Sequence, residues 1–417
     1  MKLPEFSTCR TPPWASARLG CRSVSTVTDI AAHPVTVSPV SGRRGKTEFI
    51  RLPYHLYRGD PCWIPPLEYE RRQFLSSRHN PFFSYGEVGL FLARRGPRIV
   101  GRIAAVRNSR YEEFQGKRHG FFGLFECEND PEAARALFDE ASKWLLRFDL
   151  EAMLGPVSFS LNDECGTLVS GFGHRPMVMM SYNPPYHDRL MNSCGFSKAK
   201  DLWAWKFSVE EPPAFLLEQA EQARARSGVT VRTLELQNMK TELPRMIDVY
   251  NSAWKDNWGF VPMTSEEVER HADRLRRVIE PELVLTAEVD GVPAAFLLAL
   301  PDANEAVAAA QGRLTRWGVP IGFLRMLRAA GRIEGMRMAA FGVAPGYRRL
   351  GLDALLYTEA WQAARRLGYR RAELSWTLED NAVINRVTSA MGGERYKTYR
   401  IYQRPLGSVP PAPAGRW

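Results

Sequence analysis

Hydrophobic and polar positions along this chain follow one order of patterns twice. Short apolar runs with alternating polar residues predict strands, and apolar residues spaced three or four apart predict helices. Residues 35–209 and residues 229–404 both pass from a strand through helix, hairpin, strand, helix, strand and helix to a closing strand. Because self-similar stretches indicate a duplicated unit, we expect two copies of one mixed α/β fold.

The first copy contains the elements of a mixed sheet with flanking helices. The helix expected from residue 132 follows Asn129, Asp130 and Pro131, which suit an N-cap and a first helical turn. The expected strands are 35–38, 88–93, 99–107, 119–125, 152–159 and 201–209, and the expected helices are 47–57, 132–148 and 184–194.

The second copy repeats this order, with an insertion between its hairpin and its next strand. The expected strands are 229–236, 283–289, 292–300, 336–343, 371–376 and 399–404, and the expected helices are 240–253, 265–279, 354–367 and 382–391.

Composition changes at the ends of the two copies and places the domain boundaries. We expect a first domain at 34–210 and a second at 229–406, with Glu211-Pro212-Pro213 opening the linker. Residues 1–33 are rich in Ser and Arg and lack the apolar core of a secretory signal, which favours a disordered extension over a transit-like peptide. The proline-rich residues 407–417 predict a disordered tail.

One strand-to-helix turn in the second copy has the features of an anion site. The strand 336–343 runs into Pro345 and Gly346, and Arg348, Arg349 and Gly351 follow before the helix begins. The first N–H groups of a helix lack intrahelical partners, and the helix dipole adds positive potential there. Glycine lets the backbone approach a ligand closely, so a diphosphate fits this turn.

Charge and cysteine usage narrow the partners. The formal net charge of +10 suits anionic partners such as a phosphorylated cofactor or an acidic membrane surface. No recognition-helix, zinc-finger or aromatic RNA-binding signature accompanies that charge, so we do not expect nucleic acid. The six cysteines form no C-x-x-C pair, so we expect no metal. No apolar run approaches the length that spans a bilayer, and we expect a cytoplasmic protein.

At these residues the second copy resembles the GNAT acyltransferase superfamily. The resemblance rests on Val343-x-Pro345-x-x-Arg348-Arg349-x-Gly351 between strand and helix, and on Asn381 opening a later helix. It implies that acyl-CoA binds as a co-substrate, with its pantetheine arm pairing along the strand and its pyrophosphate in the turn. The implied cofactor-binding residues are Val343, Arg348, Arg349, Leu350, Gly351, Leu352, Asp353, Asn381 and Asn385.

Two positions depart from that family pattern. Asp353 puts an acid close to the phosphates, where it would instead serve as a helix cap. Thr388 stands where many members carry a tyrosine that acts as the acid. The first copy resembles the same fold only in element order, because the corresponding turn is acidic (Glu126, Glu128, Asp130). We therefore expect two tandem GNAT-like domains of which the N-terminal one is degenerate.

The whole arrangement over about residues 35–406 is similar to a bacterial GNAT-like family whose best-defined members are ceramide synthases. The motifs that carry this similarity are Trp63–Pro66, Phe122–Cys127, Met179–Pro185 and Tyr396–Tyr399. The resemblance implies transfer of a long-chain acyl group to the amine of a sphingoid base or its keto precursor. Two alternatives stay open: an acetyl-CoA-dependent N-acetyltransferase for a small polar or protein amine, and a non-catalytic acyl-CoA-binding protein.

Several residues are candidates for the proton transfers that acylation of an amine requires. A carboxylate can take the ammonium proton, which makes Glu126 and Glu164 candidate bases, and Tyr396 and Tyr399 are candidate acids. A covalent route through Cys127 or Cys165 is the less favoured alternative, because neither has a neighbouring His or Lys in the sequence to activate a thiolate.

The insertion at 306–333 bears on the nature of the substrate. The segment 322–330 has helical spacing with one basic and one apolar face, and it contains Arg325 and Arg328. Such a helix suits the surface of an anionic membrane or a lid over an acyl chain, and equally a helix packed on the core. We therefore include a lipid amine and peripheral contact with an anionic membrane among the expected partners.

Overall fold

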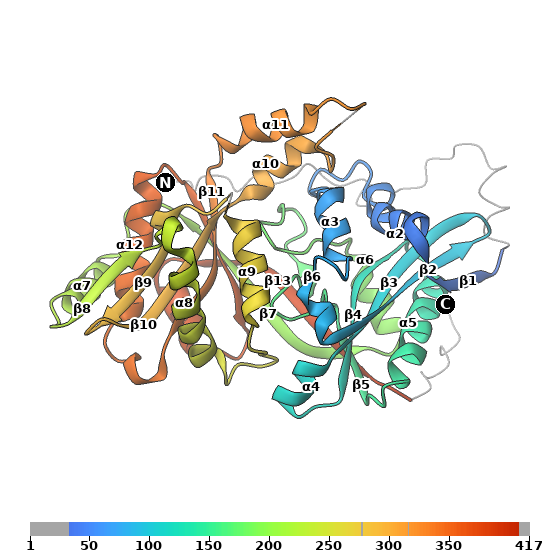
Figure 1. Cartoon of the computed structure of the whole chain (residues 1–417), viewed down its shortest axis with the longest axis horizontal. Helices are drawn as coiled ribbons and strands as arrows, with labels where there is room; N and C mark the ends of the chain where they lie inside the picture. The colour runs from blue at the N-terminus through green and yellow to red at the C-terminus, as the bar shows by residue number, and fades with distance from the viewer. Residues whose placement is uncertain (1–32, 277, 316, 408–417) are drawn as a thin grey trace. The chain divides into compact units, whose positions relative to one another are not determined.

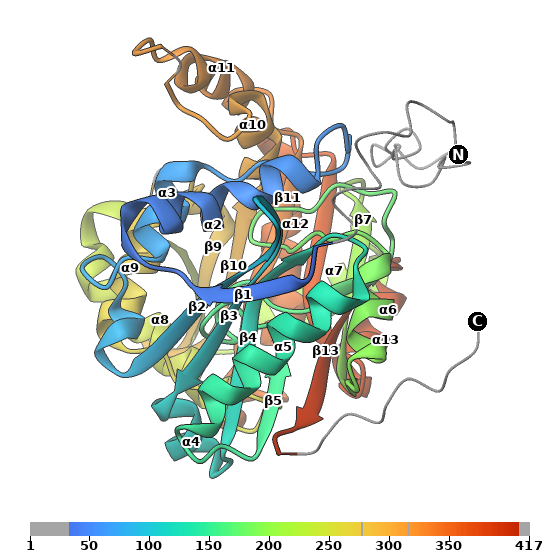
Figure 2. The same cartoon turned by 90° about the vertical axis from the view of Figure 1, so that its right-hand side faces the viewer.

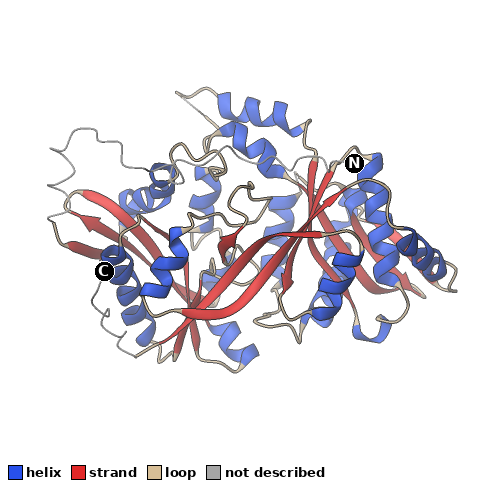
Figure 3. Cartoon of the chain, turned by 180° about the vertical axis from the view of Figure 1, so that it is seen from behind, coloured by secondary structure: helices blue, strands red, loops and turns tan. Residues whose placement is uncertain are grey.

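The computed structural model describes residues 33–276, 278–315 and 317–407. Apart from His33 and Gly407, the extension expected at 1–33 and the tail expected at 407–417 lie outside the described residues. Within them the mixed α/β class is confirmed, and Figure 3 shows the strands of each unit as a twisted sheet flanked by helices.

The described chain divides into two compact units. One consists of residues 33–201 with 398–407, and the other of residues 202–397. This division differs from the expected linker at 210–228, which contains the helix α7 (Ala214–Arg224). Leu216 on α7 is buried in the core of the C-terminal unit, which explains why this segment belongs to that unit.

The N-terminal unit is a sheet in the order β1-β2-β3-β4-β5-β13, and β6 also pairs with β13 (Figure 1). Its strands are β1 (Val35–Pro39), β2 (Gly86–Arg95), β3 (Arg98–Asn108), β4 (His119–Cys127), β5 (Ala152–Gly155), β6 (Thr167–Ser170) and the C-terminal part of β13 (Glu394–Pro405). Its helices are α2 (Gly42–Leu56), α3 (Glu68–Phe74), α4 (Ser109–Gln115), α5 (Pro131–Leu146) and α6 (Tyr186–Ser193).

The C-terminal unit is a sheet in the order β7-β12-β11-β10-β9-β8. Its strands are β7 (Ser197–Ser208), which begins in the N-terminal unit, β8 (Val229–Thr233), β9 (Val284–Val289), β10 (Val292–Pro301), β11 (Gly335–Val343) and β12 (Arg371–Leu378). Its further helices are α8 (Met239–Trp254), α9 (Ser265–Leu275), α10 (Ala303–Ala310), α11 (Ile321–Ala330), α12 (Leu352–Arg366) and α13 (Ala382–Ala390).

Two apolar cores cover the two faces of the C-terminal sheet. Leu285 and Leu297 pack with α12 on one face, whereas Val284 and Phe296 pack with α8 on the other. Successive residues of a strand point to opposite faces, so strands buried on both sides read as continuous apolar runs. The helices α10 and α11 pack against each other beyond the ends of β10 and β11 (Figure 2).

The sequence prediction is wrong about the closing strand of each copy, about some strand ends and about short helices. The strand expected at 201–209 to close the first copy pairs with β12 of the C-terminal unit, and the strand expected at 399–404 to close the second pairs with β5 and β6 of the N-terminal unit. The strand expected at 152–159 ends at Gly155, although the Val157 N–H still donates to the Phe122 carbonyl of β4 at 2.7 Å. The helix expected at 265–279 ends at Leu275. The helices α3, α4, α7 and α10 are too short or too mixed in composition for the periodicity to indicate them.

Candidate active site

The turn between β11 and α12 leaves helical N–H groups available. Gly351 occupies the N-cap position with φ +75°, and within the described ranges no side-chain cap hydrogen bond closes the first turn of α12. A positive φ is readily adopted by glycine and costs energy for residues with a side chain. The guanidinium groups of Arg348 and Arg349 are exposed beside this turn, and Arg348 also donates to the Ala253 carbonyl at 3.3 Å. The arrangement is the one that favours a bound anion.

The strands β11 and β12 separate as they approach this turn. Their parallel register runs from Gly335 opposite Arg371 to Met338 opposite Leu374, and ends there within the described chain. Ala339 is an extra residue in β11, because its neighbours Met338 and Ala340 oppose consecutive residues of β10. Such a bulge re-aims backbone groups and is common next to functional sites.

The backbone of Val343 faces the gap that β12 leaves. The Ala344 N–H donates to the Ala294 carbonyl on β10 at 2.8 Å. Because hydrogen-bonded and non-hydrogen-bonded pairs alternate in an antiparallel ladder, the N–H and C=O of Val343 point away from β10. An extended polar ligand can pair with them as an added strand.

The other residues expected around the pyrophosphate have different environments. Leu350 is half-buried against the core, and Leu352 is buried at the first position of α12. Asp353 follows in the first turn, where its carboxylate is favourable to the helix dipole. The expectation that Asp353 caps the helix is wrong, because the cap position is one residue before Leu352 and belongs to Gly351.

The two asparagines of α13 have separate roles. Asn381 is the N-cap, and its Oδ1 accepts a hydrogen bond from the Ile384 N–H at 3.3 Å. Asn385 donates from Nδ2 to the Leu378 carbonyl at 2.9 Å, and its Oδ1 is buried with no hydrogen-bond partner in the described part of the chain. The same is true of Thr388 Oγ1, one turn further along α13. Buried polar atoms of this kind call for a ligand or water.

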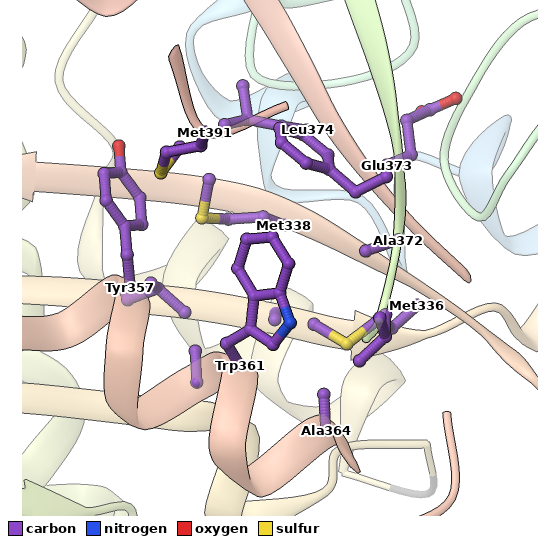
Figure 4. Close-up of a pocket in the computed structure, with 14 residues that line it drawn as sticks. Met336, Met338, Tyr357, Trp361, Ala364, Ala372, Glu373, Leu374 and Met391 are labelled. Atoms are coloured by element: carbon purple, nitrogen blue, oxygen red, sulfur yellow. The ribbon is translucent and has the colours of Figure 1, made fainter. Parts of the chain in front are cut away.

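An apolar cavity of about 60 Å³ lies between α12 and the sheet (Figure 4). Trp361 of α12 points toward Met336 and Met338 of β11, and the Glu373 carboxylate points away from the cavity. Met338 and Leu374, which also line the cavity, form the last pair of β11 with β12. Apolar space therefore begins where the two strands part.

The corresponding helix end in the N-terminal unit is closed. Asp130 caps α5, since its Oδ1 accepts hydrogen bonds from the Glu132 and Ala133 amides at 3.1 and 3.2 Å. Arg95 forms salt bridges with Asp130 and Glu132 at 2.8 and 2.7 Å. A second block is the loop after β5, where the Val157 carbonyl lies so close to Gly123 that a Cβ there would be 2.1 Å from it.

Glu126 lies in a buried polar cluster of the N-terminal unit. The Tyr57 hydroxyl donates to its carboxylate at 2.5 Å, and Arg102 lies opposite it on β3 at 3.7 Å. Burial raises the pKa of Glu126 to about 7, against the lowering effect of Arg102. A carboxyl group with such a pKa suits general base chemistry near neutral pH.

Glu164 is brought into the same unit by the loop after β5. Its carboxylate accepts a hydrogen bond from Arg71 of α3 at 2.5 Å, and its charge contributes to the raised pKa of Glu126. The two candidate bases, distant in sequence, are therefore electrostatic neighbours. Cys127 and Cys165 are buried, and burial raises the pKa of the Cys127 thiol well above its usual value, which disfavours a thiolate nucleophile.

The two candidate acids occupy different settings. Tyr399 is completely buried in the N-terminal unit, where β13 pairs with β6. Tyr396 is half-buried in the C-terminal unit, and its hydroxyl donates to the Glu373 carboxylate. Lys397 and Glu373 form a salt bridge of 3.3 Å, and both side chains have no exposed surface.

Glu373 and Lys397 are polar residues that the sequence reasoning missed. Glu373 occupies one of the alternating polar positions of the expected strand 371–376, and Lys397 precedes the expected strand 399–404, so the sequence pattern does not distinguish either residue from a charge on a solvent-facing strand. No cluster of three or more metal-ligating side chains occurs among the described residues. Within the described ranges, no helix combines the length and the hydropathy that crossing a bilayer requires.

Comparison with known proteins identifies relatives along nearly the whole chain. The bacterial ceramide synthase of Caulobacter vibrioides is 35% identical over 390 residues, which are 92% of this chain and 99% of that protein. Protein YghO of Escherichia coli is 33% identical over 392 residues, covering 91% and 98%. No protein-family model matches the chain.

Among solved structures, a tandem GNAT protein from the clavulanic acid biosynthesis pathway has the same fold. The alignment has a TM-score of 0.52 at 13% identity and covers 90% of this chain and 99% of that one. The expected tandem GNAT architecture is thereby confirmed. The chain belongs to the family of the bacterial ceramide synthase and is an acyltransferase of tandem GNAT fold.

Proposed function

We propose that this protein transfers a long-chain acyl group from acyl-CoA to the amine of a sphingoid base or its keto precursor. The name of the Caulobacter relative supports this choice of substrates. The structural observation that carries it is the apolar cavity at Met338 and Leu374, where β11 and β12 part. An acyl chain attached to a thioester in that gap would find an apolar environment beside it.

Acyl-CoA would occupy the gap from its phosphate end inward. The pyrophosphate would bind the free N–H groups at Gly351, Leu352 and Asp353 together with Arg348 and Arg349, and Leu350 would complete the turn. The pantetheine would pair with the Val343 backbone. Asn381 and Asn385 begin the neighbouring helix, and the unpartnered Oδ1 of Asn385 is available to an amide N–H of the pantetheine.

The cavity requires adjustment to hold a long chain. Its volume of about 60 Å³ is below the roughly 150 Å³ of an apolar cavity that admits benzene. Three methionines, Met336, Met338 and Met391, contribute to its wall. Methionine side chains are flexible and adapt readily to ligands, so we infer that they move aside when the acyl chain enters.

Glu126 and Glu164 are our proposed bases for removing the proton of the acceptor ammonium. The attacking amine must be neutral, and a carboxylate whose pKa lies near the working pH is the most effective acceptor of that proton. Glu126, with a pKa of about 7, fits this requirement better than Glu164, for which the ion pair with Arg71 stabilises the charged form.

Peripheral contact with an anionic membrane is part of the proposal, because a lipid acceptor resides there. Five large apolar side chains of the segment 306–333 are strongly exposed: Trp317, Val319, Phe323, Leu324 and Leu327. Arg325 and Arg328 are exposed on the same helix. An apolar face bordered by arginines is typical of a helix that lies in the membrane interface.

The test is an acyl-transfer assay with the purified protein. The acceptors are sphingoid bases and their keto precursors, and the donors are a series of acyl-CoA thioesters from acetyl-CoA to long-chain acyl-CoA. We expect N-acylated sphingoid product, identified by mass spectrometry, with rates that rise with chain length. Preference for acetyl-CoA and a polar amine would instead assign an N-acetyltransferase. Tight binding of CoA without turnover of any thioester would assign a non-catalytic binding protein.

A further inference from the structure

A cluster of buried polar side chains lies where β11, β12 and β13 meet in the C-terminal unit. Arg337, Glu373, Ser375 and Lys397 are exposed by 3%, 0%, 3% and 1% of their surfaces. Tyr396, the fifth member, is only half-buried. Charged side chains are rarely buried so completely, because removing them from water is costly.

The members of the cluster converge on the carboxylate of Glu373. Its Oε1 accepts a hydrogen bond from Ser375 at 2.6 Å, and its Oε2 accepts from Tyr396 and, at 3.3 Å, from Lys397. The Lys397 ammonium also donates to the Tyr396 oxygen at 3.0 Å. Arg337 donates from Nε to Ser375 Oγ at 2.9 Å. The Tyr396 hydroxyl is therefore fixed by a carboxylate and an ammonium at once.

Register places this cluster next to the proposed thioester. Arg337 and Glu373 are cross-strand partners, one residue before the last pair of β11 with β12 and two before the bulge at Ala339. A strand advances by about 3.3 Å per residue, so the cluster begins within two residues of the gap. The Glu373 carboxylate points away from the apolar cavity, so apolar and polar environments meet at this point (Figure 4).

Stability alone gives no reason for this arrangement. A buried ion pair is often no more stabilising than apolar residues of similar size. Burial alone would raise the pKa of Glu373, but the charges of Lys397 and Arg337 hold it below its usual value, so the carboxylate is ionised at rest. Burial lowers the pKa of Lys397, against the favourable charges of Glu373 and Asp302 and together with the repulsion from Arg337.

We propose that Tyr396 is the catalytic residue that moves the proton from the acceptor nitrogen to the thiolate of CoA, and that Glu373 and Lys397 are its positioning residues. This inference rests on the proposed acyl transfer. The nitrogen attacks the thioester carbonyl carbon, the C–N bond forms and the C–S bond breaks. The Tyr396 oxygen accepts one proton from the nitrogen while its own proton passes to Glu373.

The proton then returns from Glu373 through Tyr396 to the departing sulfur, which leaves as a neutral thiol. This return is downhill, because a carboxylic acid is far more acidic than a thiol. Lys397 favours it, since its charge keeps Glu373 ionised and its N–H fixes the Tyr396 oxygen. One proton leaves the nitrogen and one reaches the sulfur, so the cluster ends in its starting state.

The test measures kcat, KM for acyl-CoA and the solvent deuterium isotope effect on kcat. Tyr396→Phe removes one oxygen from a half-exposed residue and leaves the ion pair intact. We expect kcat to fall about 100-fold or more with an unchanged KM and a lost isotope effect, since a positioned acid–base group contributes about that factor. Glu373→Gln with Lys397→Met removes one negative and one positive buried charge, so the net charge of the cluster does not change, and should lower kcat similarly.

Glu288→Gln is the matched control. Glu288 of β9 is a buried carboxylate of the same unit, and it pairs with Arg232 and Arg245 at 3.0 and 2.9 Å. The substitution Glu288→Gln should leave kcat unchanged. If Tyr396→Phe and the folded double variant keep kcat within about threefold of an active unmodified protein, only this inference is overturned. If the unmodified protein transfers no acyl group, the proposed function fails and this inference fails with it.

Discussion

Asp130 and Gly351 occupy equivalent positions in the two units. Asp130 is the N-cap of α5, which follows β4, and Gly351 is the N-cap of α12, which follows β11. Both strands pair with their parallel neighbour, β5 or β12, only along their first residues. Asp130 covers the first amides of α5 with its carboxylate, whereas Gly351 leaves the first turn of α12 without a side-chain cap. A carboxylate at that place excludes a second anion by charge and by occupying the donors. The residue at this position is therefore one of the differences between a structural helix end and a candidate phosphate site.

Arg349→Glu combined with Gly351→Val should abolish CoA binding without unfolding the protein. The first change places a negative charge beside the phosphates, and the second puts a β-branched residue at φ +75° with its Cβ 3.2 Å from Ala223. We expect a loss in affinity of about 100-fold or more by calorimetry, at a cost in folding free energy of roughly 1–3 kcal/mol.

Gly368→Val is the control for backbone strain in this experiment. Gly368 has φ +87° at the other end of α12, with open space around it. It should lower the melting temperature to a similar extent and leave CoA affinity unchanged. Equal affinity in the double variant and the unmodified protein would show that CoA binds elsewhere.

Glu126→Gln should change how activity and stability depend on pH. Because the pKa of about 7 in the folded protein exceeds the ordinary glutamate value of 4.5, the folded state holds more protons than the unfolded state between those values. The free energy of unfolding therefore falls as pH rises through that window. Above pH 7 the full penalty of about 3 kcal/mol is present. Denaturant titrations should show the variant gaining stability relative to the unmodified protein from pH 5 to pH 8.

The same substitution tests the proposed catalytic role of Glu126. If Glu126 is the base, kcat of the unmodified protein rises with pH through an apparent pKa near 7, because only the ionised carboxylate accepts a proton. The variant should lose that rise and most of the activity. A pH profile that the substitution leaves unchanged would assign the role to another group, Glu164 first.

Local chemistry predicted the site better than long-range packing. The turn at Gly351 and the cap at Asp130 are visible in sequence because each depends on residues within one helical turn. The pair of Glu373 and Lys397 is 24 residues apart and becomes a pair only when β12 and β13 assemble. The loop that closes the N-terminal unit around Gly123 was likewise hidden, since its apolar residues resemble a continued strand.

Ala364→Leu should shorten the preferred acyl chain. Ala364 is 1% exposed and lines the cavity beneath α12, so three added carbons occupy the proposed space for the chain. We expect activity with long-chain acyl-CoA to fall about tenfold while short-chain activity is retained, because a methylene in such a pocket contributes about 1–3 kcal/mol. Met338→Ala should shift the preference toward longer chains. Unchanged chain-length profiles in both variants would remove the cavity from the acyl path.

Leu324→Glu with Leu327→Glu should release the protein from anionic membranes. These side chains of α11 are 58% and 52% exposed, so their apolar surface contributes little to the free energy of folding. The same surface would be buried if α11 lay in a lipid interface. Co-sedimentation with phosphatidylglycerol vesicles should weaken about tenfold or more, and CoA affinity should not change.

Val292→Glu alters an equally exposed residue, at 52%, on β10 and should leave vesicle binding intact. Equal binding of the unmodified protein to neutral and anionic vesicles would exclude a role for Arg325 and Arg328, since their contribution depends on the negative surface potential.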